Sequence, residues 1–224
     1  MKRRVINCVL CYLFGILLIA VGVNVSINSN LGVSPVNSFP VSVSNVTGFD
    51  RGWCVTIIFL AYVGIQALIL RSAFKLKDLL QIVFSTIFGY FVTFTGSLLG
   101  DFIIPTYFGR LAMLALSIIF IALGLVFYLT ADIVPMPMEG MAMAIAEKSK
   151  KPFHQIKTIL DCTSVALAVL ISVIGFGFKK GLLEGVVREG TVLSALVIGK
   201  VMSLFAKPLQ PIIKKWCFAE EKQQ

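Results

Sequence analysis

Six apolar segments, each about 20 residues long, constrain this chain more than any other feature. They cover residues 5–27, 53–70, 79–99, 110–131, 156–177 and 186–206. A helix needs about 20 apolar residues to cross the hydrocarbon core of a bilayer. Because lipid cannot satisfy unpaired backbone groups, each segment is expected to be a helix. The sequence therefore predicts an all-α membrane protein with six transmembrane helices, in one polytopic domain that covers residues 1–224.

The composition supports this class and argues against several others. The chain is 58% hydrophobic and only 14% charged, whereas soluble domains are about half apolar and about a quarter charged. Its 5 cysteines give no disulfide pattern, and a single histidine, His154, cannot build a metal site. The sequence also lacks a nucleotide-binding loop and the common hydrolase motifs. We therefore expect no metal, no cofactor and no enzymatic activity.

The basic residues indicate how the chain crosses the membrane. The net charge is +9, but Lys and Arg lie at the ends of apolar segments, so we do not expect nucleic-acid binding. Of the 20 Lys and Arg residues, 14 lie in the two termini and in the second and fourth links. The positive-inside rule then predicts that both termini of this multi-pass protein lie in the cytoplasm. Residues 207–224 would form a short basic cytoplasmic tail.

The sequence partly matches itself when it is shifted by 102 residues. Residues 15–23 fall on 117–125, and residues 33–39 fall on 135–141, so that Asn37 meets Glu139. The two copies cover about 5–100 and about 107–206. Since each carries three spans, an odd number, the second copy would be inverted in the membrane. Such 3+3 inverted repeats are typical of secondary transporters. The alternative is that two membrane hairpins resemble each other by composition alone.

A short helix is expected after the first span and another after the fourth. Ser34 can cap the first, which opens with Pro35 and ends near Gly48, and Pro137 opens the second, which ends near Lys150. Neither is long enough to span. If both re-enter the membrane, their positively polarised N-termini meet near the midplane with Asn37 and Glu139 in the first turns. Otherwise they are amphipathic helices at the membrane surface.

Polar residues in apolar surroundings are the candidate site. Charged groups at membrane depth cost at least about 2.5–3.5 kcal/mol, so they usually face a cavity or a partner. Asp161, four residues after Lys157, forms either a local ion pair or a proton-handling carboxylate. Arg188 either clamps a carboxylate or phosphate or anchors a helix end with Glu189. The candidate solute-binding residues are Asn24, Asn28, Ser34, Pro35, Asn37, Pro137, Glu139, Arg188 and Thr191, and the candidate coupling residues are Glu139, Asp161 and Glu189.

Three motifs resemble a known family. LGVSPVN at the start of 31–48, GVVREGT at 185–191 and ALVIG at 195–199 are similar to the YitT/YczE group of small bacterial membrane proteins. Ser34, Pro35, Asn37, Gly190, Thr191 and Gly199 fall on its pattern. Val36 and Lys200 depart from it. The resemblance implies a bacterial plasma-membrane protein with about five or six helices. The expected role of such a protein is transport.

The repeat and the polar residues favour one function over its competitors. The chain is predicted to be a secondary transporter or exporter of a small anionic or zwitterionic organic solute, coupled to protons or another ion. The alternative is a substrate-binding or regulatory membrane subunit of a larger complex. The expected partners are the lipid bilayer and the small-molecule solute. The sequence also leaves open a homo-oligomer.

Overall fold

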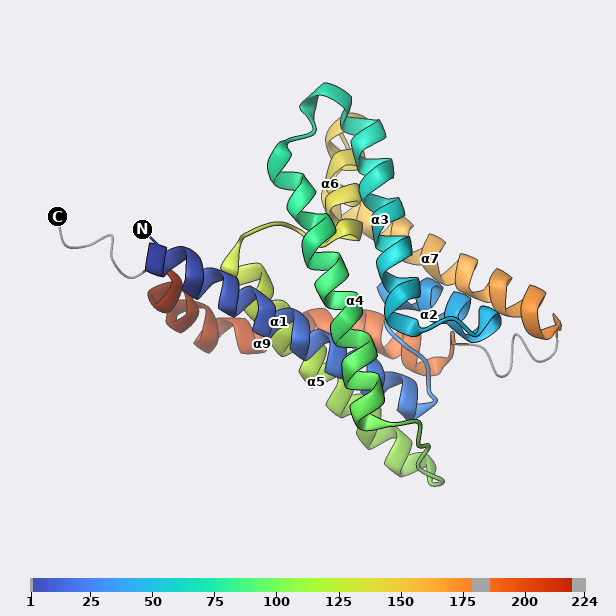
Figure 1. The fold of residues 1–224 in the computed structure, drawn as a ribbon. Coiled ribbons are helices and arrows are strands. Elements are labelled where there is room, and N and C mark those ends of the chain that lie inside the picture. Colours follow the sequence, from blue (N-terminus) through green and yellow to red (C-terminus); the bar gives the residue numbers. More distant parts are fainter. Residues whose placement is uncertain (1, 179–185, 219–224) are drawn as a thin grey trace.

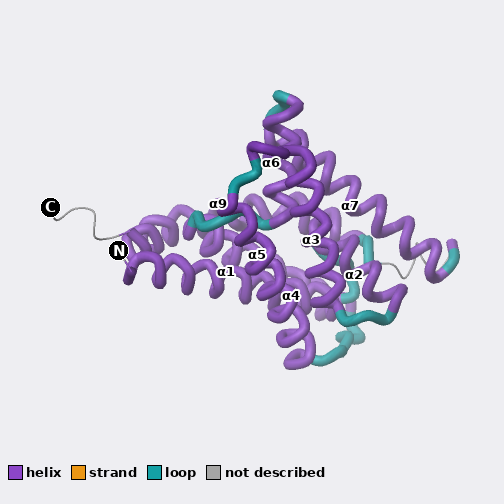
Figure 2. Tube along the Cα trace, turned by 45° about the horizontal axis from the view of Figure 1, so that its top comes forward, coloured by secondary structure: helices purple, strands orange, loops and turns teal. Residues whose placement is uncertain are grey.

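The computed structural model describes residues 2–178 and 186–218, and Figure 2 shows them as helices and loops only. Six of the described helices are long and apolar enough to cross a membrane, as the sequence predicts. They are α1 (Lys2–Ser29), α3 (Arg51–Leu70), α4 (Leu80–Leu99), α5 (Tyr107–Ala131), α7 (Phe153–Phe176) and α9 (Glu189–Phe218). Two 3-10 turns, Arg71–Ala73 and Leu76–Leu79, join α3 to α4. The chain is therefore a multi-pass, all-helical membrane protein.

The last helix is longer than its apolar segment. α9 passes Pro208 and Pro211 and continues to Phe218, whereas the predicted segment ends at residue 206. Ile213 and Cys217 are buried in the main hydrophobic core, and Leu209 packs against it. This packing stabilises a helical continuation that the two prolines alone would disfavour. Part of the expected tail is thus packed helix.

The two short helices begin and end where the sequence predicts. α2 is Pro35–Thr47 and ends at Gly48, and α6 is Pro137–Ser149 and ends at Lys150. Gly48 has a φ of 74° and Lys150 a φ of 54°, the left-handed conformation that commonly stops a helix. Ser34 occupies the N-cap position of α2, but its side chain makes no cap hydrogen bond to the helix backbone.

The centre of the molecule is a close crossing of α1 and α5. A Cβ atom on Gly124 would lie 2.5 Å from the carbonyl oxygen of Gly15. A Cβ atom on Gly22 would lie 3.0 Å from the carbonyl oxygen of Ser117. Small residues are typical of membrane helix interfaces, because they let two backbones approach without a side chain between them. The crossing therefore depends on residues that carry little or no side chain.

The other helices pack around this crossing in matching pairs. α2 packs on α7 and α6 on α3, while α4 packs on α1 and α9 on α5. Figure 1 shows the start of α1 and the end of α9 together at the left, and the α3–α4 connection at the top. The connection from α4 to α5 lies at the lower right. The amide of Asn7 donates to the carbonyl of Trp216 (3.1 Å), so the first and last helices are joined at one end.

Candidate functional site

A cavity of about 290 Å³ lies between the two short helices, and we call it the central cavity. Residues at the start of α2 and at the start of α6 both line it. α7 and α9 supply further polar side chains. The polar and N-terminal lining residues are Ser34, Pro35, Asn37, Met136, Glu139, Lys157, Asp161 and Ser194. The first turns of α2 and α6, which are far apart in the sequence, thus face one space.

Two acceptor atoms at this cavity have no partner. Asn37 is buried, and its Nδ2 donates to Oγ of Ser34 (3.1 Å). Among the described residues, neither Oδ1 of Asn37 nor Oε2 of Glu139 has a hydrogen-bond partner, although both atoms are buried. A buried polar atom left unsatisfied costs about 1–3 kcal/mol. Two such acceptors at one cavity indicate a place for a ligand that donates hydrogen bonds.

The charges at the cavity are unevenly balanced. Nζ of Lys157 lies 2.6 Å from Oδ1 of Asp161, so the local ion pair considered from the sequence is present, and both residues also line the cavity. Glu139 lies in α6, outside the six long helices. Burial raises the pKa of its carboxyl above the ordinary value, and the Lys157 ammonium acts against that shift. Within the described residues, the Glu139 carboxyl therefore has no ion-pair partner.

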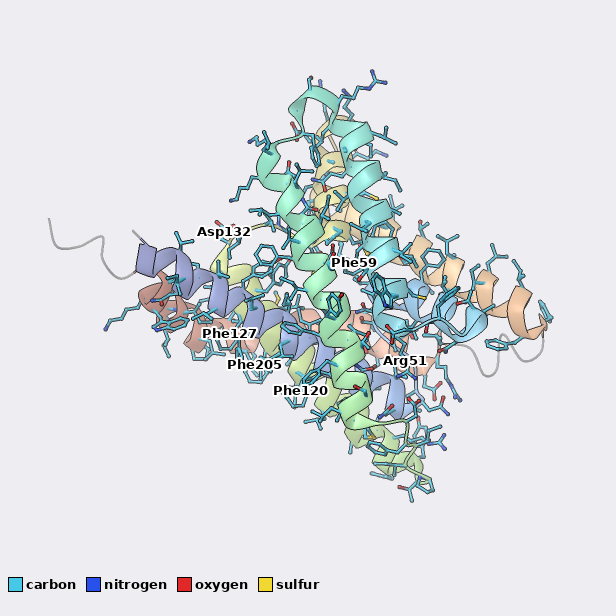
Figure 3. The ribbon with its side chains drawn as sticks, in the orientation of Figure 1. Arg51, Phe59, Phe120, Phe127, Asp132 and Phe205 are labelled. Atoms are coloured by element: carbon cyan, nitrogen blue, oxygen red, sulfur yellow. The ribbon has the colours of Figure 1, made fainter. Side chains whose placement is uncertain are left out.

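The rest of the central cavity is apolar and aromatic. Phe59 of α3 and Phe88 of α4 stack with their ring centroids 5.8 Å apart (Phe59 is labelled in Figure 3). Tyr128 of α5 also lines the wall, and its hydroxyl accepts a hydrogen bond from the backbone N–H of Met136 (3.2 Å). The aliphatic part of the wall comes from Ile19, Ile121 and Leu125. A ligand here would need a compact apolar body.

A second, more polar cavity of about 270 Å³ lies where α1 ends and α3 begins, and we call it the vestibule. Its lining includes Asn28, Asn45 and two arginines. Arg51, labelled in Figure 3, forms an ion pair with Asp101 (2.8 Å). Nη1 of Arg188 donates to Oδ1 of Asn30 (3.3 Å). Arg188 therefore lies in the vestibule and is absent from the lining of the central cavity.

The link between α1 and α2 separates the two cavities. Gly32 and Val33 line the vestibule, whereas Ser34 and Pro35, the next residues, line the central cavity. Val33 packs with Val41 and Val186 in a small apolar cluster. The backbone N–H of Val33 donates to the carbonyl of Val186 (3.3 Å). The barrier is thus a short strip of chain held against the segment that precedes α9.

The predicted site residues fall into three groups. Ser34, Pro35, Asn37, Glu139 and Asp161 line the central cavity, while Asn28 and Arg188 line the vestibule. The remaining predicted residues, Asn24, Pro137, Thr191 and Glu189, are absent from both linings.

Two residues of this last group have evident structural contacts. Nδ2 of Asn24 donates to the Val92 carbonyl (2.9 Å) and to Oγ1 of Thr95 (2.8 Å), which ties α1 to α4. Oγ1 of Thr191 accepts from the backbone N–H of Arg188 (3.3 Å) and so holds the start of α9. Glu189 is largely exposed, 3.9 Å from the Arg188 side chain.

Sequence reasoning missed several lining residues. The spacing of four residues marks Lys157 only as an ion-pair partner of Asp161, yet Lys157 also lines the central cavity. Phe59 could have been found, because the shift of 102 residues places it on Asp161. Gly199 was noted only for its motif, and a Cβ atom there would meet open space. Ser194 sits in an apolar stretch and carried no sequence signal.

Comparisons with known proteins agree with the membrane fold. The model of a family of unknown function, DUF6198, matches residues 6–207. The "Uncharacterized membrane protein YczE" of Bacillus subtilis is 27% identical over 206 residues, which cover 90% of this chain and 86% of the relative. An "Uncharacterized protein" of Haemophilus influenzae is 30% identical over 194 residues, covering 86% of this chain and 80% of the relative. No solved structure matches the chain significantly.

Proposed function

We propose that this chain, which belongs to the family of unknown function DUF6198, is a secondary transporter that carries a small organic solute through the central cavity. One observation carries the proposal: the cavity is lined by pairs of residues that are 102 positions apart. The pairs are Ile19 with Ile121, Ser34 with Met136, Asn37 with Glu139, and Phe59 with Asp161. A site to which both copies of a repeat contribute equivalent positions is the arrangement that secondary transporters use.

Contacts at the α1–α5 crossing support an inverted repeat. Gly15 meets Gly124, and the shift of 102 residues turns this pair into Ser117 and Gly22, which also meet. Such an exchange, in which each residue contacts the equivalent of its partner, is what a two-fold axis produces. The helix pairing has the same character, since α2 packs on α7 as α6 packs on α3. The axis of the repeat would then run through the central cavity.

Burial of the short helices supports re-entry over a position on the membrane surface. α2 and α6 each have 13 residues, which reach only about 20 Å. In α2, Asn37, Ser38 and Ser42 are all buried. Such polar side chains would face water on an amphipathic surface helix. We therefore place the starts of both helices near the midplane, with their C-termini toward opposite faces.

Alternating access follows from this arrangement. In the proposed cycle, the link at Gly32 and Val33 closes the outer side. Its repeat equivalent, the link before α6, closes the cytoplasmic side. That inner link is anchored by the hydroxyl of Tyr12, which donates to the Val134 carbonyl (3.2 Å). Rocking of one repeat against the other would release one link while the other stays closed. In this proposal both termini lie in the cytoplasm and the chain lies in the plasma membrane.

Proton coupling is assigned to Glu139. Burial raises the pKa of this carboxyl above its ordinary value, and the Lys157 ammonium acts against that shift. The other ionisable groups near it are Asp161 on α7, Tyr128 on α5 and Tyr12 on α1. Protonation of Glu139 would neutralise its carboxylate while the cavity changes from access at one face of the membrane to access at the other.

Accessibility from the two faces of the membrane tests the proposal. The reporter is Ser194→Cys in a background without the 5 native cysteines. It is treated with a membrane-impermeant thiol reagent in right-side-out and in inverted vesicles. We expect labelling from both faces while the vesicles still hold a pH gradient. Ser172→Cys, at a buried contact between α2 and α7, is the matched control and should stay unlabelled.

Each other result contradicts transport by alternating access. Labelling from one face only would indicate a receptor or an accessory subunit. Labelling from both faces together with collapse of the pH gradient would indicate an open pore. The reporter lies on α9 and lines the cavity, so it reads the access path without knowledge of the solute.

A further inference from the structure

We infer that the central cavity binds a small zwitterion that carries an ammonium and a carboxylate on a compact apolar body. This inference names the solute class of the proposed transporter and rests on that function for its biological role. The binding step can still be tested by itself, because it needs neither a membrane nor a gradient. Three features of the cavity carry the inference, one for each part of the ligand.

The ammonium is assigned to the unpartnered acceptors. Oδ1 of Asn37 and Oε2 of Glu139 are buried, line the same cavity and have no partner among the described residues. An ammonium has three donors and no acceptor, so one such group can satisfy both atoms. The carboxyl of Asp161 is already held by Lys157 (2.6 Å). Glu139 is therefore the carboxylate that is available to an incoming cation.

The carboxylate is assigned to the start of α2. The first backbone N–H groups of a helix have no partner within the helix and carry partial positive charge, which suits an anion. Of the first three residues of α2, Pro35 has no N–H and Asn37 donates its N–H to the Ser34 carbonyl (3.0 Å). The N–H of Val36 is left for an anion, because the Ser34 side chain makes no cap hydrogen bond to the helix backbone. At α6 the equivalent charge is opposed by Glu139 in the first turn. The two helix starts thus differ, one being suited to an anion and the other to a cation.

The apolar body is assigned to the remaining wall. Phe59, Phe88 and Ile121 offer aromatic and aliphatic surface with no charge. The volume, about 290 Å³, lies near the lower end of the range for small-molecule pockets. This size excludes a long lipid or a large cofactor and suits a solute of roughly nine to fifteen heavy atoms.

The vestibule does not have this combination. Its carboxylate, Asp101, is paired with Arg51 at 2.8 Å. The side chains of Asn30 and Arg188 hydrogen-bond each other at 3.3 Å. None of the unsatisfied buried atoms found in the described residues belongs to its lining. The vestibule is therefore a polar entrance, and the zwitterion is assigned to the central cavity alone.

A set of matched probes tests the inference on purified protein in detergent. The probes are leucine and phenylalanine, their analogues without the amino group (4-methylpentanoate and 3-phenylpropanoate) and their analogues without the carboxylate (isoamylamine and phenethylamine). Binding is measured by calorimetry and by thermal shift. We expect at least one amino acid to bind. Each of its two truncated analogues should bind about 10- to 100-fold more weakly, the usual value of a hydrogen bond to a charged group.

Two substitutions with matched controls locate the binding. Asn37→Ala and Glu139→Gln should each weaken binding of that amino acid by about tenfold or more. Asn45→Ala in α2 faces the vestibule, and Glu147→Gln in α6 is exposed, so both controls should keep wild-type affinity. Thermal unfolding without ligand verifies that all four variants are folded.

The outcomes separate this inference from the proposed function. Equal binding of an amino acid and its amine-free analogue would make the site an anion site and overturn the inference. Equal binding of the carboxylate-free analogue would make it a cation site and do the same. Absence of binding by both amino acids would also overturn it. In all three cases, labelling of Ser194→Cys from both faces would leave transport supported with a different solute.

Discussion

The crossing of α1 and α5 gives the sharpest test of the packing, through Gly124→Ala. The added Cβ would lie 2.5 Å from the carbonyl oxygen of Gly15 and 2.9 Å from the backbone nitrogen of Ile19. Ordinary contacts begin near 3.4 Å, so the two backbones must separate by about 0.9 Å. Neither contact can be relieved by a change of side-chain rotamer. Overpacking of this kind costs about 1–3 kcal/mol, and the better helix propensity of alanine returns roughly 0.5–1 kcal/mol.

The net loss for Gly124→Ala therefore lies within about 0–2.5 kcal/mol, with a central value of about 1.25 kcal/mol. At about 2–4 °C per kcal/mol for a chain of this size, this central value lowers Tm by about 2.5–5 °C. The assay is thermal unfolding in detergent, followed by tryptophan fluorescence. Gly64→Ala is the matched control, because a Cβ on this mid-helix glycine meets nothing within 4 Å. It should raise Tm slightly. A Gly124→Ala protein as stable as Gly64→Ala would refute the close crossing.

Three further predictions use the same thermal assay or the binding assay above. Asn24→Ala should lower Tm by about 2–12 °C, from about 1–3 kcal/mol for the hydrogen bonds that tie α1 to α4, and should leave the amino-acid affinity of the folded fraction unchanged; an unchanged Tm would remove its assigned role. Gly199→Leu should abolish amino-acid binding with little change in Tm, since Gly199 lines the central cavity and a Cβ there meets nothing within 4 Å; retained affinity would mean that the ligand binds elsewhere. Glu139→Gln should raise Tm at neutral pH without ligand, because a carboxyl whose pKa is raised by burial destabilises the fold once ionised. That advantage over wild type should shrink as pH falls through the raised pKa toward the ordinary value, and Glu147→Gln should show no such trend.

Parts of the candidate site were predictable because local rules place them. Proline at positions 35 and 137 opens a short helix in each copy of the repeat, and the shift of 102 residues pairs Asn37 with Glu139. Both side chains line the central cavity. The role of Asn24 was not predictable in this way. Its partners, Val92 and Thr95, lie about 70 positions away, and only the packing of α1 on α4 brings them together.

Arg188 illustrates the limit most clearly. The sequence marks it as a charge next to an apolar segment, and from that alone a clamp in the binding site is as reasonable as an anchor. The fold places it in the vestibule, across the Val33 barrier from Glu139. Depth along a helix and direction around it depend on how neighbouring helices cross, which no local pattern specifies.

The sequence by itself determined the class of the protein, the number of long helices and the positions of the two short ones. These follow from the bilayer, which requires about 20 apolar residues per span, and from proline, which favours helix starts. Only the tertiary structure decided that α9 continues to Phe218, that the central cavity and the vestibule form, and that one strip of chain separates them. Those features arise from contacts between residues distant in sequence, where close packing of whole helices outweighs the preference of any single segment.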